Sequence, residues 1–298
     1  MPSFAKASTQ AQRAVSQNIA LGTPRHTSRD DGLIHSFGTA RTYQSQLKLA
    51  AEWDKSNGGK GLKCWDEGRA KAYLSERAEV VGQKTLDASR QALQILPGIG
   101  TLAVVKSKLD TDLETRAITH EQAALIREDM TVRTSLGHEL VESAGLRASE
   151  VLTLLPIEER DPDNHRDVHP DKFVGRENWP AYTVEGKGGL VREIRIEPEL
   201  ALRLEGRRIE EPGLIIDRGI QIEQHYNVTG GQALSQSHSE HSNVEFGWST
   251  GIHGLRHTYA QERMEELQEK GCFYRDALKI VSEEMGHFRP EITEVYLR

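Results

Sequence analysis

Residues 253–260 read HGLRHTYA, the stretch that most narrows the choice of fold. His253 and Arg256 are three residues apart, so both side chains project from one face of a helix. An imidazole and a guanidinium placed in this way can hold two oxygens of one phosphate, the guanidinium through its planar fork of donors. This pattern points to chemistry on a phosphate.

The histidines of the same stretch also allow a zinc interpretation. His253 and His257 have the i, i+4 spacing of the zinc pair in HExxH, but the glutamate of that motif is missing, because Gly254 and Leu255 stand in between. His165 and His169 share the spacing and lie in an Asp-rich segment with no obvious third ligand. We therefore expect no metal site and retain zinc as the rival reading.

The stretch MGHFRPEITEVY at 285–296 adds a second imidazole and a hydroxyl. His287 follows a glycine, and Tyr296 comes nine residues later. A tyrosine near a C-terminus is usually a packing residue or simply exposed. It gains meaning as a nucleophile only if fixed positive charge and a proton acceptor accompany it.

Two segments upstream offer further positive charge. SAGLRASEVLTL (143–154) places Arg147 at the start of an expected helix, and Glu150, one turn later, can orient it. EGKGGLVREI (185–194) places Lys187 between glycines at the tip of an expected hairpin, a good mount for a mobile general acid. Each feature alone has an ordinary structural explanation, since such side chains are usually solvated.

In chain order, these segments resemble the active-site signature of the tyrosine recombinases, the family of phage integrases and Xer-type recombinases. GLRASE is similar to the family's first arginine box, GKGG to its hairpin lysine, HGLRHTYA to its HxxR box, and MGHFRPEITEVY to the Gly-His step before the nucleophilic tyrosine. The resemblance covers residues 119–298, whereas residues 37–117 match the family's core-binding domain only in their helical character. It implies a mainly α fold with a small β-hairpin or sheet (α+β).

The resemblance also implies a mechanism. Tyr296 would attack the scissile phosphate, giving a 3′-phosphotyrosine and a free 5′-hydroxyl. Arg147 and Arg256 would neutralise the transition state, and Lys187 would protonate the leaving 5′-oxygen.

The two imidazoles receive separate roles from the resemblance. His253 would help to take the tyrosine proton, and His287 would donate a hydrogen bond to the phosphate. We expect His257 to be a packing residue. The covalent link conserves the energy of the broken bond, so neither ATP nor any other cofactor is expected.

Three departures from the family pattern accompany these matches. The interval between Arg147 and Lys187 is longer than usual, and so is the interval between Arg256 and His287. The sequence stops at Arg298, where many family members continue into a segment that docks on a neighbouring protomer. We expect another surface to replace that contact or assembly to be weaker.

Hydrophobic periodicity predicts helices in the first part of the chain. Tyr43, Leu47, Ala50 and Trp53 share one helical face, and the glycines that follow end the helix. Further helices are expected at 66–81, with Asp66 as N-cap, and at 83–96. We divide the chain into a flexible N-terminal arm with room for one short helix (1–36), a helical, SAM-like core-binding domain that binds DNA (37–117) and a catalytic domain (118–298).

The catalytic domain is predicted to open with a helix and to contain a hairpin. Thr119 and Gln122 form a capping-box pattern, and the sequence around 181–198 fits two strands joined by a Gly-rich turn. Residues 157–180 are expected to form an exposed insertion, and residues 229–250 a similar loop.

Composition limits the function classes. Residues 1–115 hold 16 basic and 12 acidic residues, a net of +4, whereas residues 116–298 hold 22 and 33, a net of −11. A local basic cleft can coexist with such an acidic exterior, although the balance disfavours nucleic-acid binding at face value. Two cysteines and no long apolar run fit a soluble protein of a reducing cytoplasm.

From these features we expect a site-specific recombinase that cuts and rejoins duplex DNA, as the integrase of a mobile element. A Xer-like resolvase or invertase, and a catalytically inactive DNA-binding relative, are the alternatives. The expected partner is duplex DNA carrying a recombination site, bound by a homotetramer, with no membrane and no small-molecule substrate. The expected location is the cytoplasm of a bacterium, in association with the nucleoid.

Overall fold

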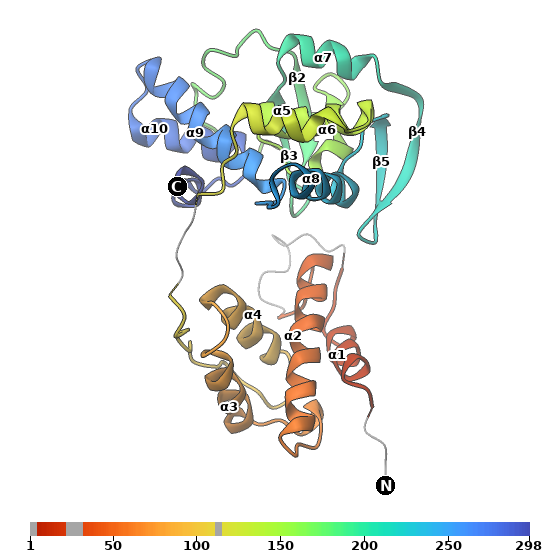
Figure 1. The fold of residues 1–298 in the computed structure, drawn as a ribbon, viewed down its shortest axis with the longest axis vertical. Coiled ribbons are helices and arrows are strands. Elements are labelled where there is room, and N and C mark those ends of the chain that lie inside the picture. Colours follow the sequence, from red (N-terminus) through yellow and green to blue (C-terminus); the bar gives the residue numbers. More distant parts are fainter. Residues whose placement is uncertain (1–4, 22–31, 111–114) are drawn as a thin grey trace. The chain divides into compact units, whose positions relative to one another are not determined.

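The computed structural model describes residues 5–21, 32–110 and 115–298, which fall into two compact units, 1–113 and 114–298 (Figure 1). Both units are mainly helical, and the second also contains two small antiparallel sheets. The predicted mainly α, α+β fold class is confirmed. No helix in the described part of the chain is long and apolar enough to cross a membrane.

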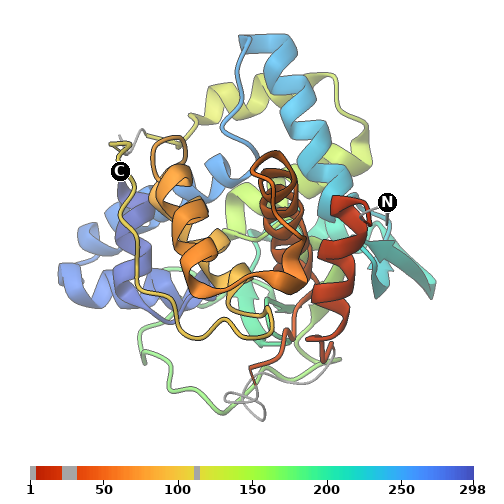
Figure 2. The same ribbon diagram turned by 90° about the horizontal axis from the view of Figure 1, so that it is seen from below.

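The first unit is a bundle of helices (Figure 2). Its elements are α1 (Ala7–Ser16), α2 (Phe37–Ser56), the 3-10 turn η1 (Leu62–Cys64), α3 (Glu67–Arg77) and α4 (Gln83–Leu93). The predicted helices are confirmed, and so is the cap at Asp66, whose side chain accepts a hydrogen bond from the Arg69 backbone N–H at 2.7 Å. Three aromatic rings, those of Trp53, Trp65 and Tyr73, meet edge to face with centroids 5.4–5.9 Å apart.

Within the expected flexible arm, residues 7–16 form a short helix, which the prediction allowed, but the helix packs into the unit. They form α1, which lies beside α2 and contributes Ala11 and Val15 to the core of the unit (Figure 1). These two residues are spaced i, i+4, which is enough to bury one helical face even in a segment rich in Ser, Thr and Gln. Residues 1–4 and 22–31 of the expected arm lie outside the described residues.

The second unit builds its core around two helices and a sheet. Its elements are α5 (His120–Glu128), α6 (Val132–Ala144), η2 (Glu150–Thr153), β1 (Leu155–Pro156), β2 (Ala181–Glu185), β3 (Val191–Arg195), α7 (Pro198–Glu205), β4 (Arg208–Asp217), β5 (Ile220–Tyr226), α8 (Gly231–Phe246), α9 (His253–Glu269), α10 (Tyr274–Glu284), α11 (Pro290–Thr293) and η3 (Glu294–Leu297). The strands pair antiparallel in the orders β1-β2-β3 and β4-β5, and Thr183 faces Glu193 in the first sheet. The predicted hairpin is confirmed as β2 and β3. The capping box of α5 is confirmed at both of its hydrogen bonds.

A separate apolar cluster holds the C-terminal elements in place. It is formed by α9 and α10, with Met264, Leu267 and Val281 among its buried side chains. Tyr296 and Leu297 of η3 pack against it. Burying one large aliphatic side chain stabilises a fold by about 1.5–3 kcal/mol, so this cluster fixes the position of η3.

One of the two loop predictions is wrong. Residues 231–246 form α8, whose buried positions include Leu234 and His238, the latter being hydrogen-bonded to His138 of α6 at 2.9 Å. Residues 157–180 contain no helix or strand and are mostly exposed, as predicted, although parts of the segment pack onto the unit. Phe173 is buried there, and Arg160 donates to the Thr183 carbonyl at 2.9 Å.

Candidate active site

A glycine at the end of α6 directs the chain into the site. Gly145 has a φ of +60°, and a Cβ at this position would lie 2.5 Å from the ring of Tyr259. Only glycine combines this backbone conformation with such a close approach. Arg147 follows two residues later and precedes the 3-10 turn η2, not the full helix that we expected.

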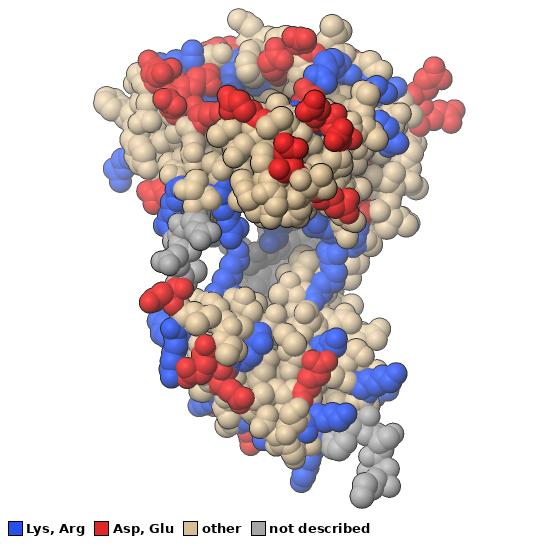
Figure 3. All heavy atoms as spheres, in the orientation of Figure 1, with Lys and Arg blue, Asp and Glu red and all other residues tan. Residues whose placement is uncertain are grey.

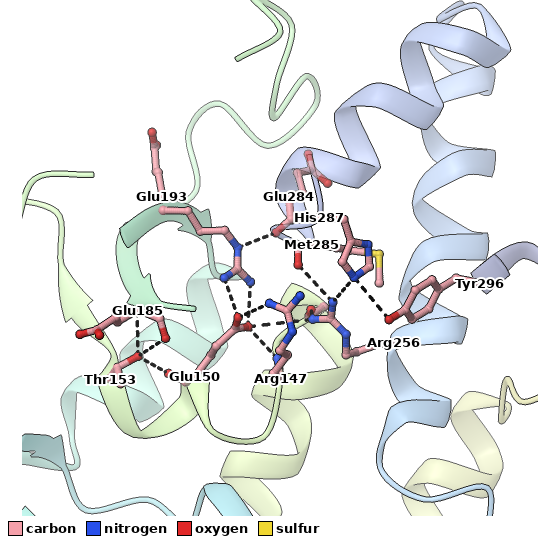
Figure 4. Close-up of polar contacts among 12 residues, drawn as sticks. Arg147, Glu150, Thr153, Glu185, Glu193, Arg256, Glu284, Met285, His287 and Tyr296 are labelled. Atoms are coloured by element: carbon pink, nitrogen blue, oxygen red, sulfur yellow. Dashed lines mark hydrogen bonds and ion pairs between the residues drawn. The ribbon is translucent and has the colours of Figure 1, made fainter. Parts of the chain in front are cut away.

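Glu150, buried at the centre of the site, gathers the arginines around it (Figure 4). Arg147 Nη1 donates to its Oε1 at 2.5 Å, and Arg192 donates from both terminal nitrogens, one to each carboxylate oxygen, at 2.8 Å. Arg256 Nη1 lies 4.0 Å away. Burial alone would raise the pKa of Glu150, but the surrounding arginines, Arg192 foremost, outweigh it and lower the pKa to about 2.

Arg256 lies on the first turn of α9 and is only 1% exposed. It donates to the carbonyl oxygens of Gly145 and Met285, the latter at 3.1 Å, and lies 3.2 Å from Nε2 of His287. Burial and the charge of Arg147 lower the pKa of Arg256 to about 10, so it stays charged at neutral pH. This side chain therefore joins three separate segments of the unit.

The charges of the cluster do not cancel. Arg147, Arg192 and Arg256 carry three positive charges, and Glu150 carries one negative charge, which leaves a net of +2. The side chain of Arg147 is 23% exposed, so part of this charge is accessible. Acidic side chains are spread over the face of the second unit that Figure 3 shows, so an acidic exterior coexists with a cationic site.

His287 lies on the turn that follows α10, where Gly286 has a φ of +72°. Burial, then the charges of Arg256 and Arg147, lower the pKa of His287 to about 3, so the ring is neutral near pH 7. Because a guanidinium can only donate, the Nε2 that faces Arg256 is the acceptor nitrogen, and the proton of the ring is on Nδ1. The hydroxyl of Tyr296, 3.3 Å from the same Nε2, is then the donor of that contact.

Tyr296 is held by its ring and by its backbone. The ring centroid lies 4.6 Å from that of His257 and 5.0 Å from that of His287. Its carbonyl oxygen lies 3.2 Å from Nδ1 of His257 and accepts from Nε2 of Gln261 at 3.1 Å. The expectation that His257 is a packing residue is confirmed, and its packing partner is Tyr296.

His253 and Lys187 lie outside this contact network. His253 is exposed at the start of α9. Partial desolvation of its ring, followed by the charges of Arg256 and Arg147, lowers its pKa. Lys187 is exposed in the turn between β2 and β3. Within the described residues, neither side chain forms a hydrogen bond or an ion pair with Tyr296. The turn itself borders the cluster, because a Cβ at Gly186 would lie 3.1 Å from Oε1 of Glu150.

The sequence reasoning missed Arg192. It lies on β3, whose buried positions are Arg192 and Ile194, and it is 2% exposed. The alternation of the strand could have revealed it. Ile196 and Ile194 point into the core, so the next inward position towards the N-terminus is 192, where the sequence has an arginine. The contact between Glu150 and Arg147 was expected and is confirmed.

The arrangement suits chemistry on a phosphodiester. Arginines with excess charge can hold an anionic phosphate, and a tyrosine hydroxyl with a neutral imidazole as acceptor can supply a nucleophile. In the described residues, no group of three or more His, Cys, Asp or Glu side chains could hold a metal ion.

No protein-family model matches the sequence, and no curated protein matches it. Among solved structures, the pre-cleavage complex of the XerH site-specific recombinase with difH substrate aligns over 99% of this chain and 94% of that chain, with a TM-score of 0.54 at 16% identity. The post-cleavage complex of XerH with a palindromic difH substrate aligns over 98% and 90%, with a TM-score of 0.57 at 15% identity.

The chain has the tyrosine recombinase fold. At this level of identity the likeness concerns the recombinase fold alone. Of the six sequence-predicted residues, the geometry of the site brings together Arg147, Arg256, His287 and Tyr296, but not Lys187 and His253.

Proposed function

We propose that the protein is a site-specific DNA recombinase that cuts and rejoins duplex DNA through a 3′-phosphotyrosine formed on Tyr296. The observation that carries the proposal is the contact of the Tyr296 hydroxyl with His287, whose same nitrogen faces Arg256. A hydroxyl nucleophile, a neutral proton acceptor and a buried cation thus meet at one point. The fold shared with XerH, which was solved bound to difH substrate, supports DNA as the substrate.

Phosphate binding is assigned to the arginines. Arg147 and Arg256 neutralise the phosphate and the charge that grows on it in the transition state. Fixed cations in a site of low water content are effective for this, because they need no reorganisation during the reaction. The exposed N-terminus of α9, with His253 on it, adds donors to a phosphate oxygen.

The proton transfers follow from the contacts. The Oη of Tyr296 bonds to phosphorus as its proton passes to Nε2 of His287, and the bond from phosphorus to the 5′-oxygen breaks. Lys187, on its exposed turn, gives a proton to that oxygen. This exchanges the roles that the family resemblance suggested for His253 and His287, because the hydroxyl lies against His287. A bound phosphate offsets the arginine charge that lowers the pKa of His287, which makes the ring a better base.

The biological role proposed is that of a mobile-element integrase, acting as a homotetramer on DNA in the bacterial cytoplasm. Dimer resolution and inversion use the same chemistry and are the alternative roles. Integration is preferred because the long segments at 157–180 and 270–276 differ from a compact resolvase.

Covalent capture tests the proposal. Genomic fragments of the source organism are incubated with the protein, denatured with SDS and retained on glass fibre, so that only protein-linked DNA is recovered and sequenced. We expect fragments that share one sequence and carry the protein on a 3′ end. Tyr296→Phe should bind the same DNA and recover none of it covalently.

The competing function is a DNA-binding protein that has the fold without the activity. Such a protein would bind a specific sequence and yield no covalent complex, whether or not Tyr296 is present. Equal recovery by wild type and Tyr296→Phe would instead rule out this tyrosine as the nucleophile.

A further inference from the structure

Arg192 and Glu150 form an ion pair that is closed off from water. The two side chains are 2% and 1% exposed, and both carboxylate oxygens accept from the guanidinium at 2.8 Å. Removing one member of a buried pair leaves an uncompensated charge, which is strongly destabilising. The pair is thus a fixed point of the site.

Arg192 also reaches the opposite half of the site. Its third donor, Nε, binds the carbonyl oxygen of Glu284 at 3.0 Å, at the end of α10. The next carbonyl, that of Met285, accepts from Arg256. One guanidinium therefore connects the Glu150 segment, which carries Arg147, to the turn that carries His287.

The stem of Arg192 sets the shape of that turn as well. A Cβ at Gly286 would lie 3.0–3.1 Å from three atoms of the Arg192 side chain. The turn packs so closely on Arg192 that only glycine fits at a φ of +72°. His287, the next residue, takes its position from this packing.

The side chain of Glu284 holds this end of α10 independently of Arg192. The carboxylate of Glu284 accepts from Arg263 at 2.9–3.3 Å and from the Tyr259 hydroxyl at 2.8 Å. Loss of Arg192 would therefore leave α10 anchored while freeing the turn and the carboxylate of Glu150. That carboxylate has Arg256 at 4.0 Å as its next cation.

We propose that Arg192 is a positioning residue of the recombination reaction: it keeps Glu150 away from Arg256 and holds the Arg147 and His287 segments in register. The inference rests on the proposed function. Without Arg192, Glu150 pairs with Arg256, and the phosphate loses a cation. DNA binding as a whole depends on a larger surface and is retained.

The experiment compares four variants on the DNA recovered by covalent capture. Arg192→Met keeps the length of the side chain without its donors, and Arg192→Lys keeps the charge without the paired donors. Arg192→Met combined with Glu150→Gln removes both charges, which restores stability if the single variant is poorly folded. Arg195→Met is the matched control, because Arg195 lies on the same strand and binds Glu193 and backbone carbonyls away from the cluster.

Thermal unfolding, DNA affinity and single-turnover cleavage are measured for each. We expect Arg192→Met to bind DNA within about 3-fold of wild type and to cleave about 100-fold more slowly, the usual effect of losing one electrostatic contact in an active site. Arg192→Lys should recover part of the rate, and Arg195→Met should cleave as wild type does. The double variant should regain stability and only part of the cleavage rate, because a glutamine at position 150 does not neutralise Arg256, whereas the link from Arg192 to the turn before His287 stays lost.

Two results would overturn the inference. One is cleavage by Arg192→Met at the wild-type rate; the other is recovery of both stability and the full wild-type cleavage rate in the double variant, which would make the pair purely structural. Absence of any covalent complex from the wild-type protein would contradict the proposed function itself, and so the two failures are distinguishable.

Discussion

The Tyr296 hydroxyl and Nε2 of His287 lie 3.3 Å apart, although nine residues separate them in the chain. The short helix α11 and the turn η3 bring them together, and the apolar cluster of α9 and α10 holds η3. Because Nε2 also faces the guanidinium of Arg256, this nitrogen is an acceptor in the resting protein. The hydroxyl proton of Tyr296 therefore already points at Nε2 of His287.

His287→Gln tests this direction. A glutamine can accept the hydroxyl hydrogen bond but cannot take its proton, so we expect cleavage to fall about 100-fold. In the free wild-type protein His287 protonates only as the pH falls through about 3. The wild-type rate should therefore change little between pH 6 and 8, whereas the residual rate of the variant should rise with pH as solvent hydroxide replaces the base.

His253→Gln is the control for that profile. If His253 only holds the phosphate, its variant should be slower than wild type at every pH by a constant factor. A rate that rises with pH in His253→Gln but not in His287→Gln would reverse the two assignments.

A sulfur-substituted substrate tests Lys187. Lys187→Ala should cleave normal DNA about 100-fold more slowly, because the leaving alkoxide lacks its proton donor. Replacing the bridging 5′-oxygen by sulfur gives a leaving group that is stable as a thiolate, so this variant should cleave at nearly the wild-type rate. Arg256→Ala, which lacks a phosphate contact, should remain slow on both substrates, and equal rescue of both variants would argue against a proton-donor role.

The acid stability of the protein tests Glu150. Its pKa in the folded protein is about 2, below the ordinary 4.5, so its stabilising effect is complete above the ordinary value and disappears as the pH falls towards 2. A shift of this size corresponds to stability on the order of 3 kcal/mol. Urea unfolding at pH 7 should find Glu150→Gln less stable than wild type, and the difference should shrink between pH 5 and 3. Glu210→Gln controls for the loss of one exposed negative charge, and a difference that stays constant with pH would contradict the prediction.

Two glycines with the same backbone conformation test the close packing behind Arg147. Gly145 and Gly247 both end helices at positive φ, +60° and +74°, but only a Cβ at Gly145 meets another residue. Gly247→Ala should cost about 1 kcal/mol of unfolding free energy for the backbone alone. Gly145→Ala should cost a further 1–3 kcal/mol or so, because the Tyr259 ring must move. If chemical denaturation gave the same loss of unfolding free energy for both variants, the Tyr259 ring would move without cost, and the prediction would be wrong.

Sequence patterns predicted the parts of the site that depend on local structure. Arg256 and His253 share a helical turn, and the hairpin that carries Lys187 is marked by its glycines. The position of Arg192 depends instead on strand register and on Glu150, 42 residues earlier, so no local pattern reveals it.

The wrong loop prediction at 229–250 has the same kind of cause. In α8 the buried position 238 holds a histidine, which is acceptable there only because His138, 100 residues earlier, provides a hydrogen bond. The exposed segment 157–180 has a distant partner as well, because Arg160 donates to the Thr183 carbonyl of the sheet. A polar composition predicts exposure unless the distant partners are known.

The anchoring of Tyr296 by His257 and Gln261 of its own chain has a consequence for mixed assemblies. The proposed nucleophile, acceptor and arginines all belong to one polypeptide, so in the proposed recombinase each subunit would carry a complete set. A subunit lacking Arg256 and a subunit lacking Tyr296 would then not complement each other, since neither would hold all of these groups. Control over when each subunit cuts would act on geometry within that subunit, and not on the delivery of a tyrosine from a neighbour.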